Sequence, residues 1–262
     1  MKIGIVGLGV VGNALREGFK QLGHDVLSHD VKFNTRIMDL IESEIIYICV
    51  PTPSKENGEA DISIVESVIS ELINIDYRGI YCLKSTVPPN TTNYLRNKFN
   101  VNIAFVPEFL RERRASEDFI LNHDILAIGS DDPESIRIIK ASHGTYPKET
   151  RIMSSTEAEL LKYFSNSINS TKIIFANMFY DIAQKLNVNY DIIIQSWSLR
   201  NMDKLDYLNV NDKLRGFGGV CLPKDTKAID FYAKSIGVDY KILESVLSDN
   251  SKLDITVFDG MR

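Results

Sequence analysis

The sequence has little that would tie the chain to a membrane, a nucleic acid or a disulfide framework. Its 262 residues include three cysteines, Cys49, Cys82 and Cys221, and no Cys-x-x-Cys pair for zinc or a redox dithiol. Positive charge is not in excess, since 30 Lys and Arg stand against 35 Asp and Glu. No apolar stretch approaches the roughly 20 residues that span a bilayer. We therefore expect a cytoplasmic protein without membrane, metal or nucleic acid partners.

Composition and length indicate an ordinary globular protein. Apolar residues make up 44% of the chain and charged residues 25%, which is typical of a folded domain and atypical of a disordered one. A chain of this length forms one large or two modest domains. A change of pattern along the chain would mark the boundary between two domains.

The first half alternates apolar, β-branched runs with helical stretches, an order that predicts a parallel sheet. The runs lack polar alternation, as expected for strands covered by helices on both faces. The predicted strands are 2–6, 25–28, 45–50, 80–84, 103–106 and 125–128, and the predicted crossover helices are 11–22, 62–73 and 133–141.

The second half changes to helical spacing of apolar residues from Ser154 to about Leu186. Ser154 and Glu157 have the spacing of a capping box, which predicts that a long helix begins there. Further helices are expected at 190–201 and 225–235, with a glycine-rich loop at 216–219. The sequence therefore predicts two domains, a sheet domain at 1–153 and a helical domain at 154–262.

A Gly-x-Gly-x-x-Gly motif follows the first predicted strand and opens the first predicted helix. In that context, glycines allow backbone amides to approach a pyrophosphate at the helix N-terminus. Asp30 ends the second predicted strand, where a carboxylate accepts ribose hydroxyls and repels an extra phosphate, so NAD is favoured over NADP. Glycines that serve only packing, or an NADP site using Lys32 and His29, are the alternatives. The predicted cofactor residues here are Gly7, Gly9, Val10, Val11, Gly12 and Asp30.

The glycine-rich loop leads into Cys221, which precedes Pro223, Lys224 and Asp225. Proline suits the first turn of a helix, so Cys221 is expected just ahead of a helix N-terminus. That position and a neighbouring lysine favour the thiolate, which makes Cys221 a candidate nucleophile. The alternative is a small apolar filler, which is our interpretation of Cys49 and Cys82.

Several segments, taken in order, resemble one known family. They are the glycine turn at 7–12, Val-Pro-Thr-Pro at 50–53, Lys-Ser-Thr-Val-Pro at 84–88, Pro-Glu-Phe-Leu-Arg-Glu at 107–112, Glu-Ala-Glu-Leu-Leu-Lys at 157–162 followed by Asn166, and the cysteine loop. The chain resembles the UDP-glucose/GDP-mannose dehydrogenases, which oxidise the C6 alcohol of a sugar nucleotide to a carboxylate with two NAD. The resemblance implies a Rossmann-type doubly wound parallel sheet followed by an all-α domain built on a long central helix.

The resemblance also implies a set of active-site residues. Cys221 is similar to the family's nucleophile, Glu108 to its acid–base residue, and Asp225 to the partner of the thiol. Lys162 and Asn166 correspond to groups on the central helix and share one helical face. Thr86 resembles the residue that holds the catalytic water, and Glu112 falls on a position associated with the active site. The further cofactor contacts implied are Pro51, Thr52, Thr86 and Lys224.

The implied mechanism has two successive hydride transfers to NAD. Cys221 attacks the intermediate aldehyde, and water activated through Glu108 hydrolyses the resulting thioester. Lys162 and Asn166 stabilise the developing oxyanion. Without the resemblance, the favoured interpretation is that Lys162 is a solvated lysine and that Glu108 and Glu112 pair on the surface with arginines at 111, 113 and 114.

The chain departs from the family at its C-terminal side. It has no room for the third domain that covers the nucleotide of the substrate, and 210–215 is an abbreviated approach to the cysteine loop. We therefore expect weak binding of UDP-glucose by the chain alone. Either a partner polypeptide supplies the missing surface, or the protein uses a smaller substrate that needs only the first two domains. The alternatives are a β-hydroxyacid-dehydrogenase-like oxidoreductase and a non-catalytic NAD-binding protein. A homodimer is expected through the long helix, whose apolar residues include Phe164, Ile173, Ile174, Phe175 and Phe179.

Overall fold

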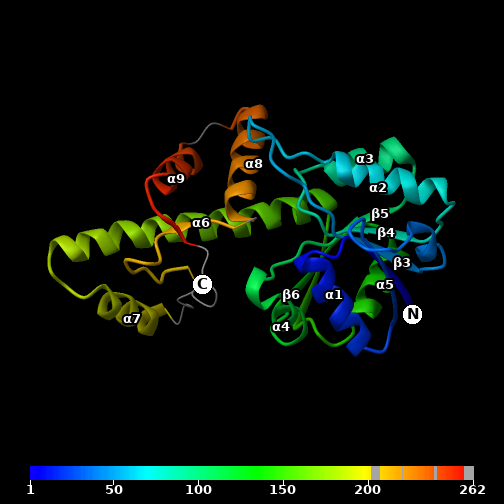
Figure 1. The fold of residues 1–262 in the computed structure, drawn as a ribbon, viewed down its shortest axis with the longest axis horizontal. Coiled ribbons are helices and arrows are strands. Elements are labelled where there is room, and N and C mark those ends of the chain that lie inside the picture. The colour runs from blue at the N-terminus through cyan, green and yellow to red at the C-terminus, as the bar shows by residue number, and fades with distance from the viewer. Residues whose placement is uncertain (202–206, 220, 239–240, 257–262) are drawn as a thin grey trace. The chain divides into compact units, whose positions relative to one another are not determined.

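The computed structural model describes residues 1–201, 207–219, 221–238 and 241–256, drawn in colour in Figure 1. The chain divides into two compact units. Unit 1 comprises Met1–Pro53 and Ala60–Lys162, and unit 2 comprises Ser54–Glu59 and Tyr163–Arg262. We propose residue 153 as the boundary between the domains in the sequence, because the last strand of the sheet ends there.

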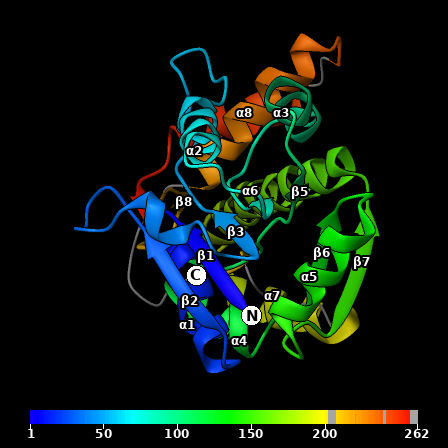
Figure 2. The same ribbon diagram turned by 90° about the vertical axis from the view of Figure 1, so that its right-hand side faces the viewer.

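Unit 1 is built on a seven-stranded sheet with the strand order β2-β1-β3-β4-β5-β6-β7. In Figure 2 its edge strands β2 and β7 lie at opposite sides of the view. Six strands lie where the sequence predicts them. The seventh, β7, was not predicted because it is an edge strand whose residues are mostly exposed and include charged side chains. The strands are β1 (Lys2–Val6), β2 (Asp25–His29), β3 (Ile45–Ile48), β4 (Ile80–Leu83), β5 (Ile103–Phe105), β6 (Ile125–Gly129) and β7 (Glu149–Met153).

The sheet is parallel, as predicted, except at one pairing. β5 and β6 are antiparallel and are registered through a single pair, Phe105 with Gly129. The other neighbours in the sheet are parallel. Because β5 and β6 overlap only at their last residues, no run of ladder hydrogen bonds sets a common direction for them.

Helices cover both faces of this sheet. Ile45 and Tyr47 of β3 belong to a buried cluster with α1, α4 and α5, whereas Ile46 and Ile48 belong to a second cluster with α2 and α3. Alternate residues of one strand thus bury against opposite layers, which confirms the doubly wound fold. The helices are α1 (Val10–Gln21), α2 (Ser63–Asn74), α3 (Thr91–Phe99), α4 (Ala115–Ile120) and α5 (Pro133–His143), with short 3-10 turns η1 (Ile37–Leu40) and η2 (Glu112–Arg114).

The long helix α6 (Ser155–Lys185) carries the chain from unit 1 into unit 2. Its predicted capping box is present. The Ser154 N–H donates to Glu157 Oε2 at 2.8 Å, and the Glu157 N–H donates to Ser154 Oγ at 3.3 Å. Two amides at the helix start are thereby satisfied, which explains why the helix begins at this residue.

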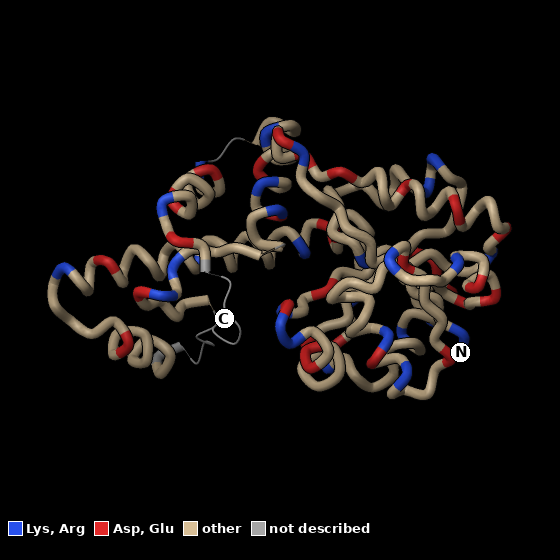
Figure 3. The backbone as a smooth tube through the Cα atoms, viewed as in Figure 1, with Lys and Arg blue, Asp and Glu red and all other residues tan. Residues whose placement is uncertain are grey.

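Unit 2 is mainly helical, with α7 (Tyr190–Asn201), α8 (Leu222–Ser235) and α9 (Ile242–Asn250) following α6. It also contains a small parallel pair, β8 (Gly216–Phe217) and β9 (Ile255–Thr256), which the expectation of an all-α domain did not include. Two-residue strands are too short to leave a periodic signal. Among the described residues, no helix is both long and apolar enough to cross a bilayer. Figure 3 shows Lys and Arg positions interspersed with Asp and Glu positions along both units.

Candidate active site

The turn between β1 and α1 can be built only from glycines at its first and last motif positions. Gly7 has a φ of +91°, and a Cβ there would lie 2.7 Å from the Cys49 carbonyl oxygen. A Cβ on Gly12 would lie 1.9 Å from the Gly7 carbonyl oxygen. Gly9 differs, since a Cβ at that position would have no other atom within 4 Å. The open side of the turn therefore lies at Gly9 and the exposed Val10, ahead of Val11 in the first turn of α1, which fits a bound pyrophosphate.

Asp30 lies directly after β2 and is tied to this turn. Its Oδ2 accepts a hydrogen bond from the Leu8 N–H at 2.7 Å, and its Oδ1 accepts one from the Lys32 N–H at 2.9 Å. The hydrogen bonds from Leu8 and Lys32 lower the pKa of the Asp30 carboxyl, which is therefore ionised at neutral pH. A charged carboxylate beside the glycine turn fits the ribose hydroxyls of NAD.

Two threonines meet beyond the carboxyl ends of β3 and β4. The buried Thr52 donates its hydroxyl to the Thr86 carbonyl at 2.7 Å. Pro51 is exposed beside Thr52, and Thr86 is half-buried. The carboxyl ends of parallel strands share one edge of the sheet, so these residues lie along the edge that also carries the glycine turn.

Glu108 and Lys162 form a buried ion pair within unit 1. Lys162 Nζ donates to Glu108 Oε1 at 2.9 Å and to the Glu108 carbonyl at 2.7 Å, with both residues less than a tenth exposed. The Leu110 N–H donates to the other carboxylate oxygen at 2.8 Å. Burial by itself would raise the pKa of Glu108, but the positive charge and hydrogen bond of Lys162 lower it overall.

This pair excludes the surface interpretations of both residues. Lys162 is only 4% exposed, so it is not a solvated lysine. Arg111 pairs with Asp118, through an Nη2 to Oδ1 distance of 2.6 Å, and Glu108 pairs with a lysine. Glu112 is exposed at the first residue of η2.

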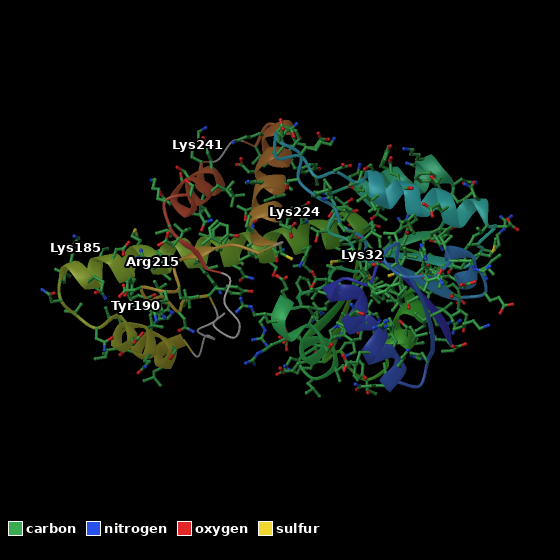
Figure 4. The ribbon with its side chains drawn as sticks, viewed as in Figure 1. Lys32, Lys185, Tyr190, Arg215, Lys224 and Lys241 are labelled. Carbon is green, nitrogen blue, oxygen red and sulfur yellow. The ribbon has the colours of Figure 1, made fainter. Side chains whose placement is uncertain are left out.

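Unit 2 brings three further predicted residues together at the start of α8, where Figure 4 labels Lys224. Asn166 of α6 donates its side-chain amide to Asp225 Oδ2 at 2.5 Å, and Lys224 Nζ donates to Asp225 Oδ1 at 2.5 Å. Asp225 is 1% exposed, so its charge is compensated by an ammonium and an amide. The neighbouring Ser170 and Thr226 hydroxyls lie 2.7 Å apart and fasten α8 to α6.

Cys221 is the residue immediately before α8, as Pro223 predicts, and its thiol is exposed. The Asp225 N–H donates to the Cys221 carbonyl at 2.8 Å, which closes the first turn of the helix behind it. The other two cysteines have different surroundings. Burial raises the pKa of Cys49 to about 12 and raises that of Cys82 as well. Cys221 therefore has the most accessible thiol, next to the positive end of a helix dipole.

The chain segment that leads to Cys221 is anchored on α6. Arg215 donates from Nε to Asn177 Oδ1 at 2.6 Å and from Nη2 to Asp181 at 2.8 Å, and the Arg215 carbonyl accepts from Asn177. Phe217 of β8 is buried and is held by both polar atoms of Asn250. The abbreviated approach at 210–215 is thus fixed to unit 2 by side chains.

Two further charged residues that the sequence did not single out are buried, although both lie in motifs that carry the family resemblance. Lys84 is 4% exposed at the end of β4, and Glu159 is fully buried in the first part of α6. The sequence could have indicated them, because each is a charged residue next to an otherwise apolar strand or helix face, and charges are buried only when they have partners.

Comparison with known proteins agrees with both units. Residues 28–146 match the family model for the NAD binding domain of the UDP-glucose/GDP-mannose dehydrogenase family, and residues 156–252 match that for its central domain. A UDP-glucose 6-dehydrogenase from Rickettsia bellii is 33% identical over 96% of this chain and 67% of its own length. A UDP-glucose dehydrogenase structure from Pyrobaculum islandicum superposes with a TM-score of 0.87 at 28% identity, over 96% of this chain and 68% of that one.

A 3-hydroxyisobutyrate dehydrogenase from Mycobacterium tuberculosis has the same fold, with a TM-score of 0.77, but is only 13% identical. The chain spans between about half and two thirds of the length of the curated UDP-glucose 6-dehydrogenases it matches, and the matched part includes an NAD-binding domain. Its order of motifs, its fold and its relatives agree that the chain belongs to the UDP-glucose/GDP-mannose dehydrogenase family.

Proposed function

We propose that the chain carries the catalytic residues of an NAD-dependent nucleotide-sugar 6-dehydrogenase, of the UDP-glucose to UDP-glucuronate type. The observation that carries this proposal lies on α6. Lys162, paired with Glu108, and Asn166, paired with Asp225, are one helical turn apart on one face of a single helix. An ammonium and an amide donor at that spacing suit the oxygen of one reacting carbon.

The proposed reaction converts a primary alcohol and water into a carboxylate. In the first oxidation the hydroxyl proton leaves to a base and the carbon loses a hydride, which gives an aldehyde. The Cys221 thiolate then forms a C–S bond to the aldehyde carbon, and loss of a second hydride leaves a thioester. Water, deprotonated through Glu108, breaks the C–S bond and releases the carboxylate and the Cys221 thiol. When bound, NAD is the acceptor of each hydride.

The residues of the chain have separate tasks in this scheme. Glu108 is ionised and can accept a proton, since Lys162 holds its pKa below the usual range. Lys162 and Asn166, both less than a tenth exposed, stabilise negative charge on the substrate oxygen. Asp225 orients Asn166 and Lys224. Thr86 is proposed to hold the catalytic water and Glu112 to lie near the substrate.

The cofactor is proposed to lie along the glycine turn, with Asp30 on the ribose hydroxyls. The charge of Asp30 opposes a 2′-phosphate, so NAD is expected to bind more tightly than NADP. Replacement of Asp30 by Ser should weaken NAD binding and reduce the difference between the affinities for NAD and NADP. Fluorescence titration with both cofactors measures these affinities. Tighter binding of NADP than of NAD by the unaltered chain would show that Asp30 has another role.

The chain matches between about half and two thirds of the length of its relatives, and we propose that further polypeptide contributes to binding the nucleotide of the substrate. Remote contacts to a nucleotide help to orient the reacting carbon, so their loss lowers turnover as well as affinity. We therefore expect weak binding of UDP-glucose by this chain alone, and stronger binding once a partner covers the nucleotide. Calorimetry in which the chain alone binds UDP-glucose with micromolar affinity and oxidises it rapidly would contradict this expectation.

The decisive test is the stoichiometry of oxidation. The chain is incubated with excess NAD and a panel of UDP-glucose, GDP-mannose, UDP-N-acetylmannosamine and 3-hydroxy acids, and NADH and product are counted. Two NADH for each sugar nucleotide, with a carboxylate product, is the expected result. One NADH with a hydroxy acid favours an activity like that of the related hydroxyacid dehydrogenase fold. NAD binding without turnover of any substrate favours a non-catalytic role.

A further inference from the structure

Lys84 is a buried cation at the carboxyl end of β4, with no role in the proposed reaction. Its side chain is 4% exposed, and its Nζ donates to the Pro107 carbonyl at 3.2 Å. That carbonyl belongs to the peptide bond that joins Pro107 to Glu108. A lysine contributes little to a core by packing, and its burial is unfavourable unless a neighbouring group gains from its charge.

Glu108 is the neighbouring group whose ionised form is stabilised by the charge of Lys84. Its carboxylate interacts with the positive charge of Lys84 as well as with that of Lys162, and both interactions favour the ionised form. The two lysines come from different elements, β4 and α6, and Lys84 and Lys162 repel each other. Two buried cations against one carboxylate are stable together only if that carboxylate keeps its charge.

The remaining titratable groups around this centre differ in charge and in element. Cys49, after β3, interacts with both Lys84 and Glu108, and Cys82 of β4 interacts with Lys84. Two buried histidines on the α4 and α5 side, His123 and His143, have their pKa lowered by burial and further by the charge of Lys84. These thiols and imidazoles are neutral near pH 7, because burial raises the pKa of both thiols and lowers that of both imidazoles.

We propose that Lys84 is a positioning residue for Glu108, holding the Pro107–Glu108 peptide through a hydrogen bond and keeping the Glu108 carboxylate negatively charged. The acid–base task of Glu108 belongs to the proposed function, on which the catalytic consequence of this inference rests. The effect of Lys84 on the position and charge of Glu108 does not rest on the proposed function, because the charge state of Glu108 can be measured in the absence of any reaction.

The geometry divides the work between the two lysines. Lys162 binds the carboxylate directly, so it must yield if that carboxylate takes a proton from water. Lys84 instead donates a hydrogen bond to the backbone carbonyl of Pro107, the residue before Glu108, and need not move. A cation that stays in place while its neighbour changes partners keeps the base ionised until it accepts the proton.

The test compares variants at position 84 by the titration of Glu108. Lys84→Gln removes the charge but keeps a donor for the Pro107 carbonyl, Lys84→Met removes both, and Lys84→Arg keeps both. Cys82→Ala is the matched control, because it perturbs the same buried strand without removing a cation. Carboxyl carbons are labelled with 13C, and the Glu108 signal is assigned by its absence in Glu108→Gln.

We expect the Glu108 midpoint to move to higher pH in Lys84→Gln and to stay near the wild-type value in Lys84→Arg and Cys82→Ala. In the pH profile of kcat, the acid limb should move upward with the midpoint. The loss in kcat at neutral pH should be about tenfold, less than the roughly 10²–10⁴-fold that a whole acid–base group contributes.

An unchanged Glu108 midpoint in Lys84→Gln overturns the proposal, and so does an equal shift in Cys82→Ala. If Lys84→Gln and Lys84→Met both fail to fold, Lys84→Arg decides the question, because a displaced midpoint in that folded, charged variant contradicts positioning by charge. A shifted midpoint in a chain that oxidises no sugar nucleotide supports the inference and counts against the proposed function alone.

Discussion

The three cysteines of this chain differ in how readily each can form a thiolate. Cys221 is exposed beside a helix N-terminus, whereas burial raises the pKa of Cys49 to about 12. We predict that Cys221→Ser stops net oxidation while NAD affinity stays nearly unchanged, because in the proposed reaction the thiol acts only after the first hydride has left. Cys49→Ala is the control and should keep both net oxidation and NAD affinity. The measurements are NADH formation and NAD titration, and full turnover in Cys221→Ser would exclude a thioester.

Glu159 is a buried carboxylate that caps a neighbouring helix from α6. It accepts hydrogen bonds from the Asn90 N–H, the Thr92 N–H and the Thr92 hydroxyl, at 2.5 to 2.7 Å, at the start of α3. Burial raises the pKa of Glu159 to about 7, against the opposing effect of these hydrogen bonds. A proton on Glu159 is therefore bound more tightly in the folded chain than in the unfolded one.

The sign of the pH dependence follows from that difference. The contribution of Glu159 to stability is complete below its ordinary pKa and is lost as pH rises toward 7. Glu159→Gln cannot ionise at this position. We predict that, as pH rises from about 4.5 to about 8, its free energy of unfolding increases relative to that of wild type by up to about 3 kcal/mol. Urea unfolding across this range measures it.

Glu157 provides the control for that experiment. It lies two residues earlier at the surface, and its hydrogen bonds to Ser154 lower its pKa. Glu157→Gln should therefore give no gain in stability as pH rises. An equal gain in both variants would indicate an effect of net charge and not of burial.

At the scale of elements, the β1–α1 turn separates two roles of glycine. A Cβ at Gly12 meets backbone of the turn itself, whereas a Cβ at Gly9 meets only open space. We predict that Gly12→Ala lowers the unfolding free energy by several kcal/mol and abolishes NAD binding. Gly9→Ala should leave thermal stability within a few degrees of wild type while weakening NAD binding at least tenfold. Strong NAD binding by Gly9→Ala would place the pyrophosphate elsewhere.

The elements that the sequence predicted well are those with a strong periodic or apolar signal. Helix α7 agrees at both ends, α6 differs by one residue at each end, and β1 agrees at both ends. Helices α3, α4 and α9 were missed, because they are only six to nine residues long and so give too few turns for a sustained periodic signal.

The candidate site was predictable in its residue types but not in its contacts. The order of motifs identified Glu108, Lys162, Asn166 and Asp225, yet only the fold shows which carboxylate pairs with which donor. Such pairs join residues more than 50 positions apart, and no local pattern encodes them. The antiparallel pairing of β5 with β6 is of the same kind, since it depends on a single contact at the ends of two strands.

At the scale of the whole molecule, α6 leaves a line of apolar side chains exposed. Of the apolar residues expected on more than one side of this helix, Ile173 is buried within unit 2 and Ile174 packs against the same cluster. The exposed stripe consists of Phe164, Ile168, Phe175, Phe179, Ile182 and Leu186, spaced by three, four or seven residues. Such a stripe is characteristic of a surface that binds another protein chain.

We predict a homodimer through this stripe, related by a two-fold axis. Phe179→Asp should raise the dimer dissociation constant at least a hundredfold, because it places a charge among apolar side chains. Leu121→Asp, at an exposed leucine in unit 1, is the control and should leave assembly unchanged. Sedimentation velocity at micromolar concentration measures both. A wild-type chain that is monomeric there would contradict the prediction.

The single residue pair between β5 and β6 has a consequence for how the sheet opens. β6 and β7 share a five-residue register, and β1 is registered with β2 over five residues and with β3 over four. The strand pairing between β5 and β6 consists of Phe105 and Gly129 alone. The segment β6–α5–β7 is thus a candidate for cooperative local unfolding while the rest of the sheet stays intact. Its backbone amides should exchange with deuterated solvent in one group, at a lower opening free energy than those of β1, β3 and β4. One common opening free energy for all seven strands would mean that the helices, and not the strand pairings, decide how this half of the molecule comes apart.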